Sequence, residues 1–161
     1  MNEAYEARIS KELIRLIHLQ ALESYPYEVG GSLIGTEEGF VYTIQYIAVT
    51  TLYKRRTKGI LIADDVGAYW DVEALGLGPT HLQVIGEWHS HPDATAVMSR
   101  ATDLTRWDRR MGVRSDAEEM EDGNLEWISA LVPSKIGCPR YSDRVYIKLG
   151  NRIRRVRIVR L

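Results

Sequence analysis

The clearest hydrophobic pattern lies near the start of the chain, where apolar residues recur at the spacing of one helix face. The segment "SKELIRLIHLQALESY" predicts a helix that begins after Ser10, a suitable N-cap, and ends before Pro26. A second helix is predicted over "DDVGAYWDVEALGLG", residues 64–78. A third is predicted over 99–112, because apolar residues fall at i, i+3 and i+7: Leu104, Trp107 and Met111.

Between these helices, β-branched and aromatic residues mark the predicted strands. They are "GGSLIGT" (30–36), "FVYTIQYIAVTT" (40–51), "HLQVIGEWHSH" (81–91), "LEWISALVPS" (125–134) and the tail "RVYIKLGNRIRRVRIVRL" (144–161). The tail is predicted to be a hairpin that turns at Gly150-Asn151. Another hairpin turn is predicted at "EEG" (37–39), and loops at the basic "LYKRRTKG" (52–59) and the acidic "SDAEEMEDGN" (115–124).

The order of these elements indicates one α/β domain over residues 1–161, with a mixed sheet flanked by helices. The chain of 161 residues contains no repeat, low-complexity tract or internal linker. A chain of this length can bury a core without disulfides. Its single cysteine, Cys138, excludes an intramolecular disulfide and a multi-cysteine zinc cluster, and is predicted to be a small buried residue.

The near-neutral charge of the chain bears on which classes of binding partner are expected. Hydrophobic residues make up 45% of the chain, charged residues 27%, and the formal net charge is −1. This balance disfavours nucleic acid or an anionic membrane as the main partner. The N-terminus "MNEAYEARIS" does not resemble a signal peptide, and no apolar run reaches the roughly 18 residues of a membrane span. We therefore expect a cytoplasmic protein.

The tail is the most basic part of the chain. From Arg140 onward it carries eight basic residues against one acid, Asp143. The favoured interpretation is a solvated outer face or a charged edge strand that resists aggregation. A docking face for an acidic partner is the alternative. For the basic loop 52–59, the favoured interpretation is likewise a solvated loop. Contact with an acidic or carbonyl-rich segment of a substrate is the alternative.

The segment "GEWHSHPDATAVMSRATDL", residues 86–104, carries the candidate chemistry. His89 and His91 are two residues apart on a predicted strand, so their side chains share one face, while Trp88 points to the core. Ser99 and Asp103 would lie one turn apart on the following helix. Two imidazoles and one carboxylate would give a metal ion three protein ligands and leave the fourth tetrahedral position open, as in catalytic zinc sites.

Upstream residues extend this pattern. Glu28 precedes "VGGSLIG", "HSHP" follows at 89–92, and then come Ser99 and Asp103. In this order the motifs, which span residues 26–103, resemble the JAMM or MPN-plus (JAB-type) zinc metalloproteases, in a compact prokaryotic form. These enzymes cleave isopeptide bonds to ubiquitin and related chains. The resemblance implies the MPN/JAB fold, which is similar to that of the cytidine deaminases, and Zn²⁺ as cofactor.

The spacing departs from the family pattern at one point. The family usually has two residues between the serine and the aspartate, whereas here there are three, and Thr102 occupies the expected position. Positions i+3 and i+4 both stay on one helix face, and threonine is a poor zinc ligand. Asp103 is therefore predicted to be the third ligand, with Asp93 as a weaker substitute.

The resemblance also implies the roles of the residues around the ion. Zn²⁺ would lower the pKa of a bound water toward about 7. Glu28 would take up the proton and pass it to the departing amine, and Ser99 would hydrogen-bond the oxyanion. Glu87 lies on the same strand face as the histidines and competes for the base role, although a carboxylate there is better suited to steadying a histidine. His18 and His81 are not expected to join the site.

The predicted function is zinc-dependent hydrolysis of the bond after the C-terminus of a ubiquitin-like modifier, or of a small-protein tail. By resemblance, this activity would belong to a bacterial antiphage or ubiquitin-like pathway. The substrate, a ubiquitin-like protein or protein tail, is the expected partner, with no nucleic acid or membrane. The alternative is a catalytically silent MPN scaffold. A zinc deaminase is disfavoured, since it needs H-x-E and P-C-x-x-C motifs.

Overall fold

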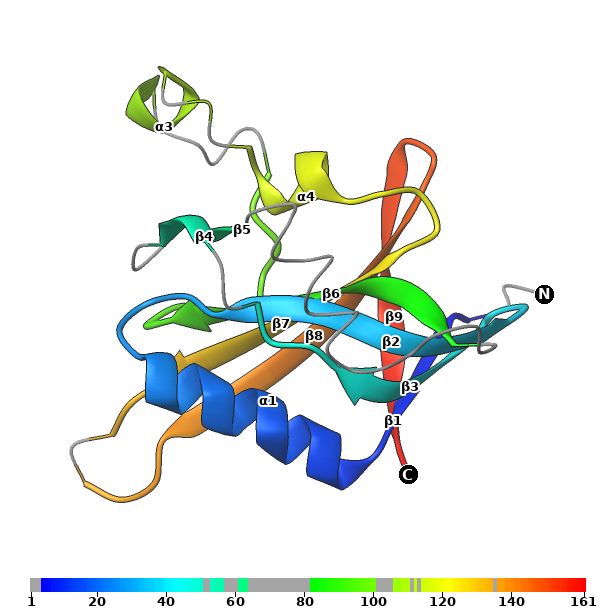
Figure 1. Ribbon diagram of the computed structural model, residues 1–161, viewed down its shortest axis with the longest axis horizontal. Helices are drawn as coiled ribbons and strands as arrows, with labels where there is room; N and C mark the ends of the chain where they lie inside the picture. The colour runs from blue at the N-terminus through cyan, green and yellow to red at the C-terminus, as the bar shows by residue number, and fades with distance from the viewer. Residues whose placement is uncertain are drawn as a thin grey trace.

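A closed barrel of seven strands dominates the structure (Figure 1). The computed structural model describes residues 4–50, 53–56, 61–63, 82–100, 106–110, 112, 114–134 and 136–161. The elements are β1 (Glu6–Ile9), α1 (Lys11–Ser24), β2 (Gly30–Glu38), β3 (Val41–Ile47), β4 (Tyr53–Arg56), β5 (Leu61–Ala63), β6 (Gln83–Pro92), α3 (Arg106–Arg110), α4 (Asp116–Glu119), β7 (Leu125–Val132), β8 (Arg140–Leu149) and β9 (Arg152–Arg160).

The barrel follows the order β1-β3-β2-β6-β7-β8-β9, and β4 and β5 form a separate two-stranded sheet. The predicted mixture of strand directions is confirmed: β6 and β7 are parallel, and β2 is antiparallel to both β3 and β6. The prediction of a sheet flanked by helices needs correction, because β1 pairs in parallel with both β3 and β9 and closes the sheet. This strand has only four residues, too few for a periodic signal in the sequence.

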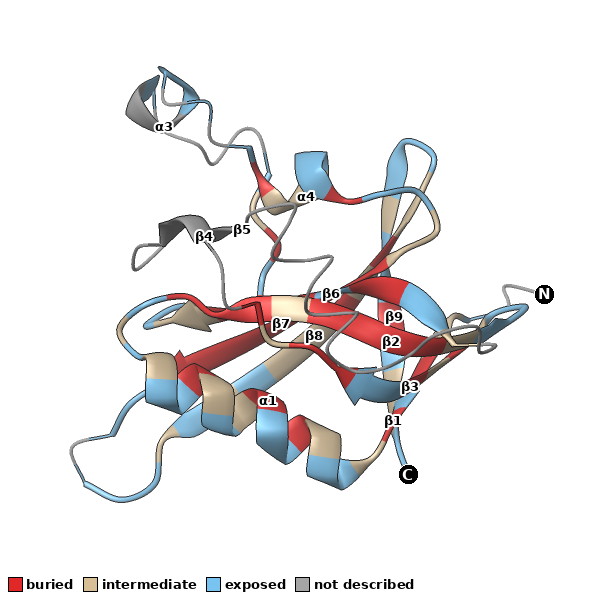
Figure 2. Ribbon diagram, viewed as in Figure 1, coloured by how far each residue is buried: buried red, intermediate tan, exposed pale blue. Residues whose placement is uncertain are grey.

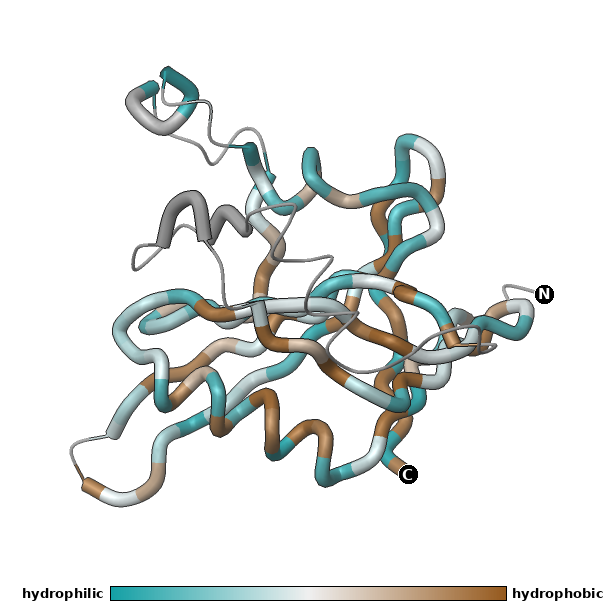
Figure 3. Tube along the Cα trace, viewed as in Figure 1, coloured by the Kyte–Doolittle hydropathy of each residue, from teal (hydrophilic) through white to brown (hydrophobic). Residues whose placement is uncertain are grey.

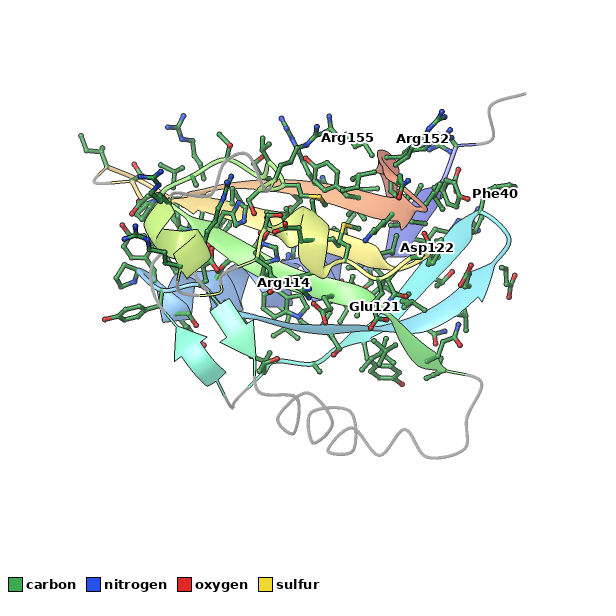
Figure 4. All side chains as sticks on the ribbon, turned by 90° about the horizontal axis from the view of Figure 1, so that it is seen from above. Phe40, Arg114, Glu121, Asp122, Arg152 and Arg155 are labelled. Carbon is green, nitrogen blue, oxygen red and sulfur yellow. The ribbon has the colours of Figure 1, made fainter. Side chains whose placement is uncertain are left out.

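Closure also changes the interpretation of the basic tail. The predicted hairpin is confirmed, with β8 and β9 joined at Gly150-Asn151. However, β9 is not an edge strand, since it pairs with β1 on its other side. Its arginines are exposed, including Arg152 and Arg155, which Figure 4 labels. They therefore form a solvated outer face, and the acidic docking partner remains a prediction.

The first predicted helix is confirmed as α1. Ser10 caps it, because its Oγ accepts a hydrogen bond from the Leu13 backbone N–H at 3.2 Å. One side of the helix buries Ile14, Ile17 and Ala21, and α1 packs against β3 and β7 (Figure 2). Figure 3 shows hydrophobic positions along α1 and the central strands, whereas α4 is mostly hydrophilic. No helix in the described ranges is long and apolar enough to cross a membrane.

The core inside the barrel fixes the strands that carry the candidate site. Trp88 is 1% exposed, as predicted for a core residue, and its Nε1 donates to the Ala48 carbonyl at 2.9 Å. Trp127 and Leu33 are also fully buried. Gly31 allows close packing of β2, since a Cβ atom there would lie 1.9 Å from the Ala48 carbonyl oxygen. Large-to-small changes in such a core cost about 3–5 kcal/mol for tryptophan.

The predicted helix over 99–112 is wrong at its start. Ser99 and Arg100 are not helical, and α3 covers only Arg106–Arg110 among the described residues. The Ser99 carbonyl accepts a hydrogen bond from the Ala117 N–H at 3.2 Å. The Ser99 backbone is thus tied to the start of α4, next to its N-cap Ser115, by a tertiary hydrogen bond.

Three smaller predictions also need correction. The acidic loop 115–124 contains the short helix α4, which Ser115 and Glu118 cap at its N-terminus. The basic loop 52–59 contains β4, which pairs with β5. Cys138 is exposed instead of buried. The predicted helix over 64–78, together with His81 and Asp103, lies outside the described residues.

Candidate metal centre

The candidate site lies where the chain entering β2 runs beside the end of β6. Gly30 pairs with His89, and the Ser90 N–H donates to the Val29 carbonyl at 2.8 Å. The Val29 N–H in turn donates to Ser90 Oγ at 3.0 Å. Directly paired residues share a face of the sheet, and so do residues two apart on one strand. Glu28 is thereby directed to the same face as His89 and His91, with no side chain at Gly30 to intervene.

Three potential ligand atoms converge on this face. The two Nε2 atoms of His89 and His91 are 2.9 Å apart. Asp116 Oδ1 lies 3.5 Å from His89 Nε2, and its Oδ2 lies 3.6 Å from His91 Nε2. A tetrahedral ion with bonds of about 2.0–2.2 Å holds its ligand atoms about 3.3–3.6 Å apart. Both nitrogen–oxygen distances match this spacing, whereas the two Nε2 atoms, at 2.9 Å, would have to move slightly apart to share an ion. Among the described residues, this is the one group of His, Cys, Asp and Glu with metal-ligand spacing.

Among the described residues, Asp116 supplies the third potential ligand atom, a role for which the sequence predicts Asp103. The predicted ligand Asp103 lies outside the described residues, and the predicted substitute Asp93 instead accepts hydrogen bonds from the Tyr25 hydroxyl at 2.7 and 2.9 Å. Asp116 was missed because its segment is acidic and was interpreted as a loop. The spacing of Ser115 and Glu118 is that of a capping box, which could have revealed a helix N-terminus there.

Ser99 and Asp116 hold each other in place. The Ser99 N–H donates to Asp116 Oδ2 at 2.8 Å, and the Asp116 N–H donates to Ser99 Oγ at 2.9 Å. Ser99 thus lies beside Asp116, joined to it by tertiary hydrogen bonds, whereas its predicted proximity to Asp103 concerns a residue outside the described ranges. Asp116 also begins α4, where the N-terminal end of a helix favours a negative charge.

The electrostatics of the group favour a bound cation. Burial opposes a charged imidazole, yet Glu126 and Asp116 together raise the pKa of His89 well above its usual value. Burial likewise opposes the Asp116 carboxylate, but hydrogen bonds from His89 and His91 hold its pKa far below the usual range. The group therefore concentrates negative charge around two imidazoles, an arrangement that a divalent cation would also stabilise.

Glu28, the predicted general base, is buried at this site with 8% of its surface exposed. Burial raises its pKa to about 7, while His89 and His91 act in the opposite direction. A carboxyl group with a pKa near neutrality can both accept and release a proton at physiological pH. The acidity of Glu28 is therefore compatible with proton transfer at this site.

The carboxylate that contacts Nδ1 of His89 is Glu126, and not Glu87 as predicted. Glu126 Oε1 lies 2.5 Å from His89 Nδ1, whereas Glu87 is an exposed residue. Nδ1 of His91 donates to the Thr95 carbonyl at 3.0 Å. Both histidines thus use Nδ1 for orientation and direct Nε2 to the common point. Glu126 was missed because β7 was interpreted only as an apolar strand.

Comparisons with known proteins agree with this fold. The family model described as prokaryotic homologs of the JAB domain matches residues 10–135. Among solved structures, a protein from Desulfitobacterium hafniense is similar over 96% of this chain and 92% of its own, with 12% identity and a TM-score of 0.67. A protein from Salinibacter ruber is similar over 96% of this chain and 91% of its own, with 22% identity and a TM-score of 0.58. A search of curated proteins found no match. At such identities the solved structures establish the fold alone.

Proposed function

Because the chain belongs to the family of prokaryotic homologs of the JAB domain, we propose that it is a metal-dependent peptidase or isopeptidase. The observation that carries the proposal is the convergence of His89, His91 and Asp116 beside the buried Glu28. A scaffold protein would not require three metal-ligand atoms at this spacing together with a carboxyl group whose pKa lies near 7.

The proposed ion is Zn²⁺, held by Nε2 of both histidines and by the Asp116 carboxylate. Two nitrogens and one oxygen are a common ligand set for catalytic zinc, and three protein ligands leave one position for water or substrate. When bound, the ion would polarise the scissile carbonyl and make a water more acidic. The same donor set could hold another divalent transition metal, so metal content should be measured directly.

The surrounding residues would supply proton transfer and orientation. Glu28 would accept a proton from the attacking water and deliver it to the departing amine. Ser99 already accepts the Asp116 N–H through Oγ, which leaves its own hydroxyl proton available for the developing oxyanion. We therefore propose Glu28 as general acid–base and Ser99 as oxyanion donor, in agreement with the roles that the resemblance implies.

The proposed substrate is a protein joined through the C-terminus of a ubiquitin-like modifier, or a modifier with a short C-terminal extension. This choice is supported by the resemblance of the motifs to isopeptidases. The activity of Glu28→Gln on such a fusion provides the central test. Glutamine preserves size and removes basicity, so we expect zinc content to be unchanged and kcat to fall about 10²- to 10⁴-fold.

Glu38→Gln, a change at an exposed residue at the far end of β2, is the matched control and should cleave like the wild type. Equal kcat for Glu28→Gln and wild type would remove Glu28 from the mechanism and make Glu87→Gln the next variant. A zinc-loaded wild type that binds the modifier without cleaving any fusion would establish the silent scaffold instead.

A further inference from the structure

Glu126 is a charged residue within an otherwise largely apolar strand. The β7 sequence "LEWISALV" contains one acid, and Glu126 is only 7% exposed there. Burying a carboxylate without a partner is costly, so a buried acid on such a strand needs a specific contact. Its contact is His89, whose Nδ1 lies 2.5 Å from Glu126 Oε1.

The contact occupies the ring nitrogen of His89 that faces away from the candidate metal position. A histidine that donates its Nδ1–H to a carboxylate is fixed in one tautomer and keeps the Nε2 lone pair available. In His89, Nε2 is the atom that faces His91 Nε2 at 2.9 Å and Asp116 Oδ1 at 3.5 Å. The orientation imposed by Glu126 is therefore the orientation that metal binding requires.

The two histidines are held by unlike acceptors. His91 donates Nδ1–H to a neutral backbone carbonyl, that of Thr95, at 3.0 Å. His89 instead contacts a carboxylate on a central strand of the barrel, which pairs with both β6 and β8. Hydrogen bonds to ionised acceptors are about twice as strong as those between neutral groups. His89 should therefore be the more rigidly held of the two histidines.

We propose that Glu126 is a positioning residue that fixes the tautomer and orientation of His89 and thereby strengthens metal binding. The proposal rests on the proposed metal site. It assigns no contact with substrate to Glu126, whose effect passes through the imidazole of His89.

Glu87 provides a matched control from the same face of the barrel. It is the register partner of Glu126 across the parallel strands β6 and β7, so both side chains share one face. Glu87 is an exposed residue, although partial burial of its carboxyl group raises its pKa to about 7, and it is not the residue that contacts His89 Nδ1. A comparison of the two glutamates separates the specific contact from a general effect of negative charge near the site.

The test measures Zn²⁺ affinity by competition with a chelator for the wild type, Glu126→Gln, Glu126→Ala and Glu87→Gln. Loss of such an outer carboxylate typically weakens metal binding 10- to 100-fold. We expect Glu126→Gln to fall in that range, Glu126→Ala to be weaker still, and Glu87→Gln to stay within about twofold of the wild type. The visible absorption bands of the Co²⁺-loaded protein should shift in both Glu126 variants and remain unchanged in Glu87→Gln.

Equal affinities and equal Co²⁺ spectra for Glu126→Gln and Glu87→Gln would overturn the inference while leaving the proposed function intact. A wild type that binds no Zn²⁺ or Co²⁺ would overturn both. If neither Glu126 variant folds, the wild type decides the matter by ¹⁵N NMR of the zinc-loaded protein. Protonated Nδ1 and metal-bound Nε2 in His89 would support the inference, and metal-bound Nδ1 would overturn it.

Discussion

Among the described residues, His89 and His18 each contact a largely buried glutamate or aspartate, on opposite sides of the same sheet. His89 on β6 contacts Glu126 at 2.5 Å on the outer face, and His18 on α1 contacts Asp143 at 2.8 Å on the inner side. Asp143 also accepts a hydrogen bond from Trp127 Nε1 at 3.1 Å. Both carboxylates are largely buried, so the contacts themselves do not distinguish the two pairs.

The difference lies in what surrounds each imidazole. Nε2 of His89 faces a second histidine and Asp116, whereas Nε2 of His18 is the atom that contacts Asp143. The His18 ring stacks on Tyr141 with centroids 4.1 Å apart. Within the described part of the chain, the metal-ligand group includes His89 and not His18. The His18–Asp143 pair therefore anchors α1, whereas the His89–Glu126 pair orients a candidate metal ligand. The feature that distinguishes the two pairs is the presence of further donor atoms, from His91 and Asp116, near His89.

The largest expected effect is on zinc content, which should depend on His89 and His91 but not on His18. Replacing His89 and His91 together by alanine should abolish stoichiometric zinc, because two of three ligands are removed. His18→Ala should retain it. Elemental analysis of the purified proteins measures both. Equal zinc in the double variant and the wild type would place the metal elsewhere.

The next effect identifies the third ligand. Asp116→Asn preserves the shape of the side chain but makes it a weaker metal ligand. It should reduce Zn²⁺ affinity by about 100-fold or more, which is at least the effect of losing a carboxylate that only hydrogen-bonds a metal-ligating histidine. Asp103→Asn should have little effect. Chelator competition at fixed pH provides the comparison. The reverse order would restore Asp103 as the ligand predicted from the sequence.

The smallest expected effect concerns the contact between His18 and Asp143. Asp143→Ala would leave the Trp127 indole N–H and His18 without their acceptor, and should lower the free energy of unfolding by about 1–3 kcal/mol. Zn²⁺ affinity should stay within about twofold of the wild type. Urea denaturation of the metal-free protein measures the stability. A loss of zinc affinity at unchanged stability would contradict the purely structural role of this pair.

The strands and the histidine motif could be predicted from local sequence because each has a local signal. The caps of α1, the hairpin at Gly150-Asn151 and the shared face of His89 and His91 depend on spacings of a few residues. Barrel closure depends on the pairing of β1 with β9, from opposite ends of the sequence, and no local pattern encodes it.

The same reasoning explains why Asp116 and Glu126 could not be predicted from the sequence. Both reach the histidines through tertiary contacts across long sequence separations, so motif spacing favours the nearer Asp103, which lies outside the described residues, and Glu87. Asp116 and Glu126 nevertheless each have a weak signal in the local sequence. Asp116 follows an N-cap serine, and Glu126 is one acid within an apolar strand. A buried charge on a core strand could have prompted a search for its partner.

The paired hydrogen bonds between Ser99 and Asp116 have a consequence for the evolution of this domain. They fasten both ends of the segment 100–115, so the position of the aspartate does not depend on the number of residues between them. Doubling the length of such a connection costs only about 0.6 kcal/mol in closure entropy. Insertions or deletions between the two anchors should accordingly be tolerated over evolutionary time, because they leave the geometry of the candidate metal ligands unchanged.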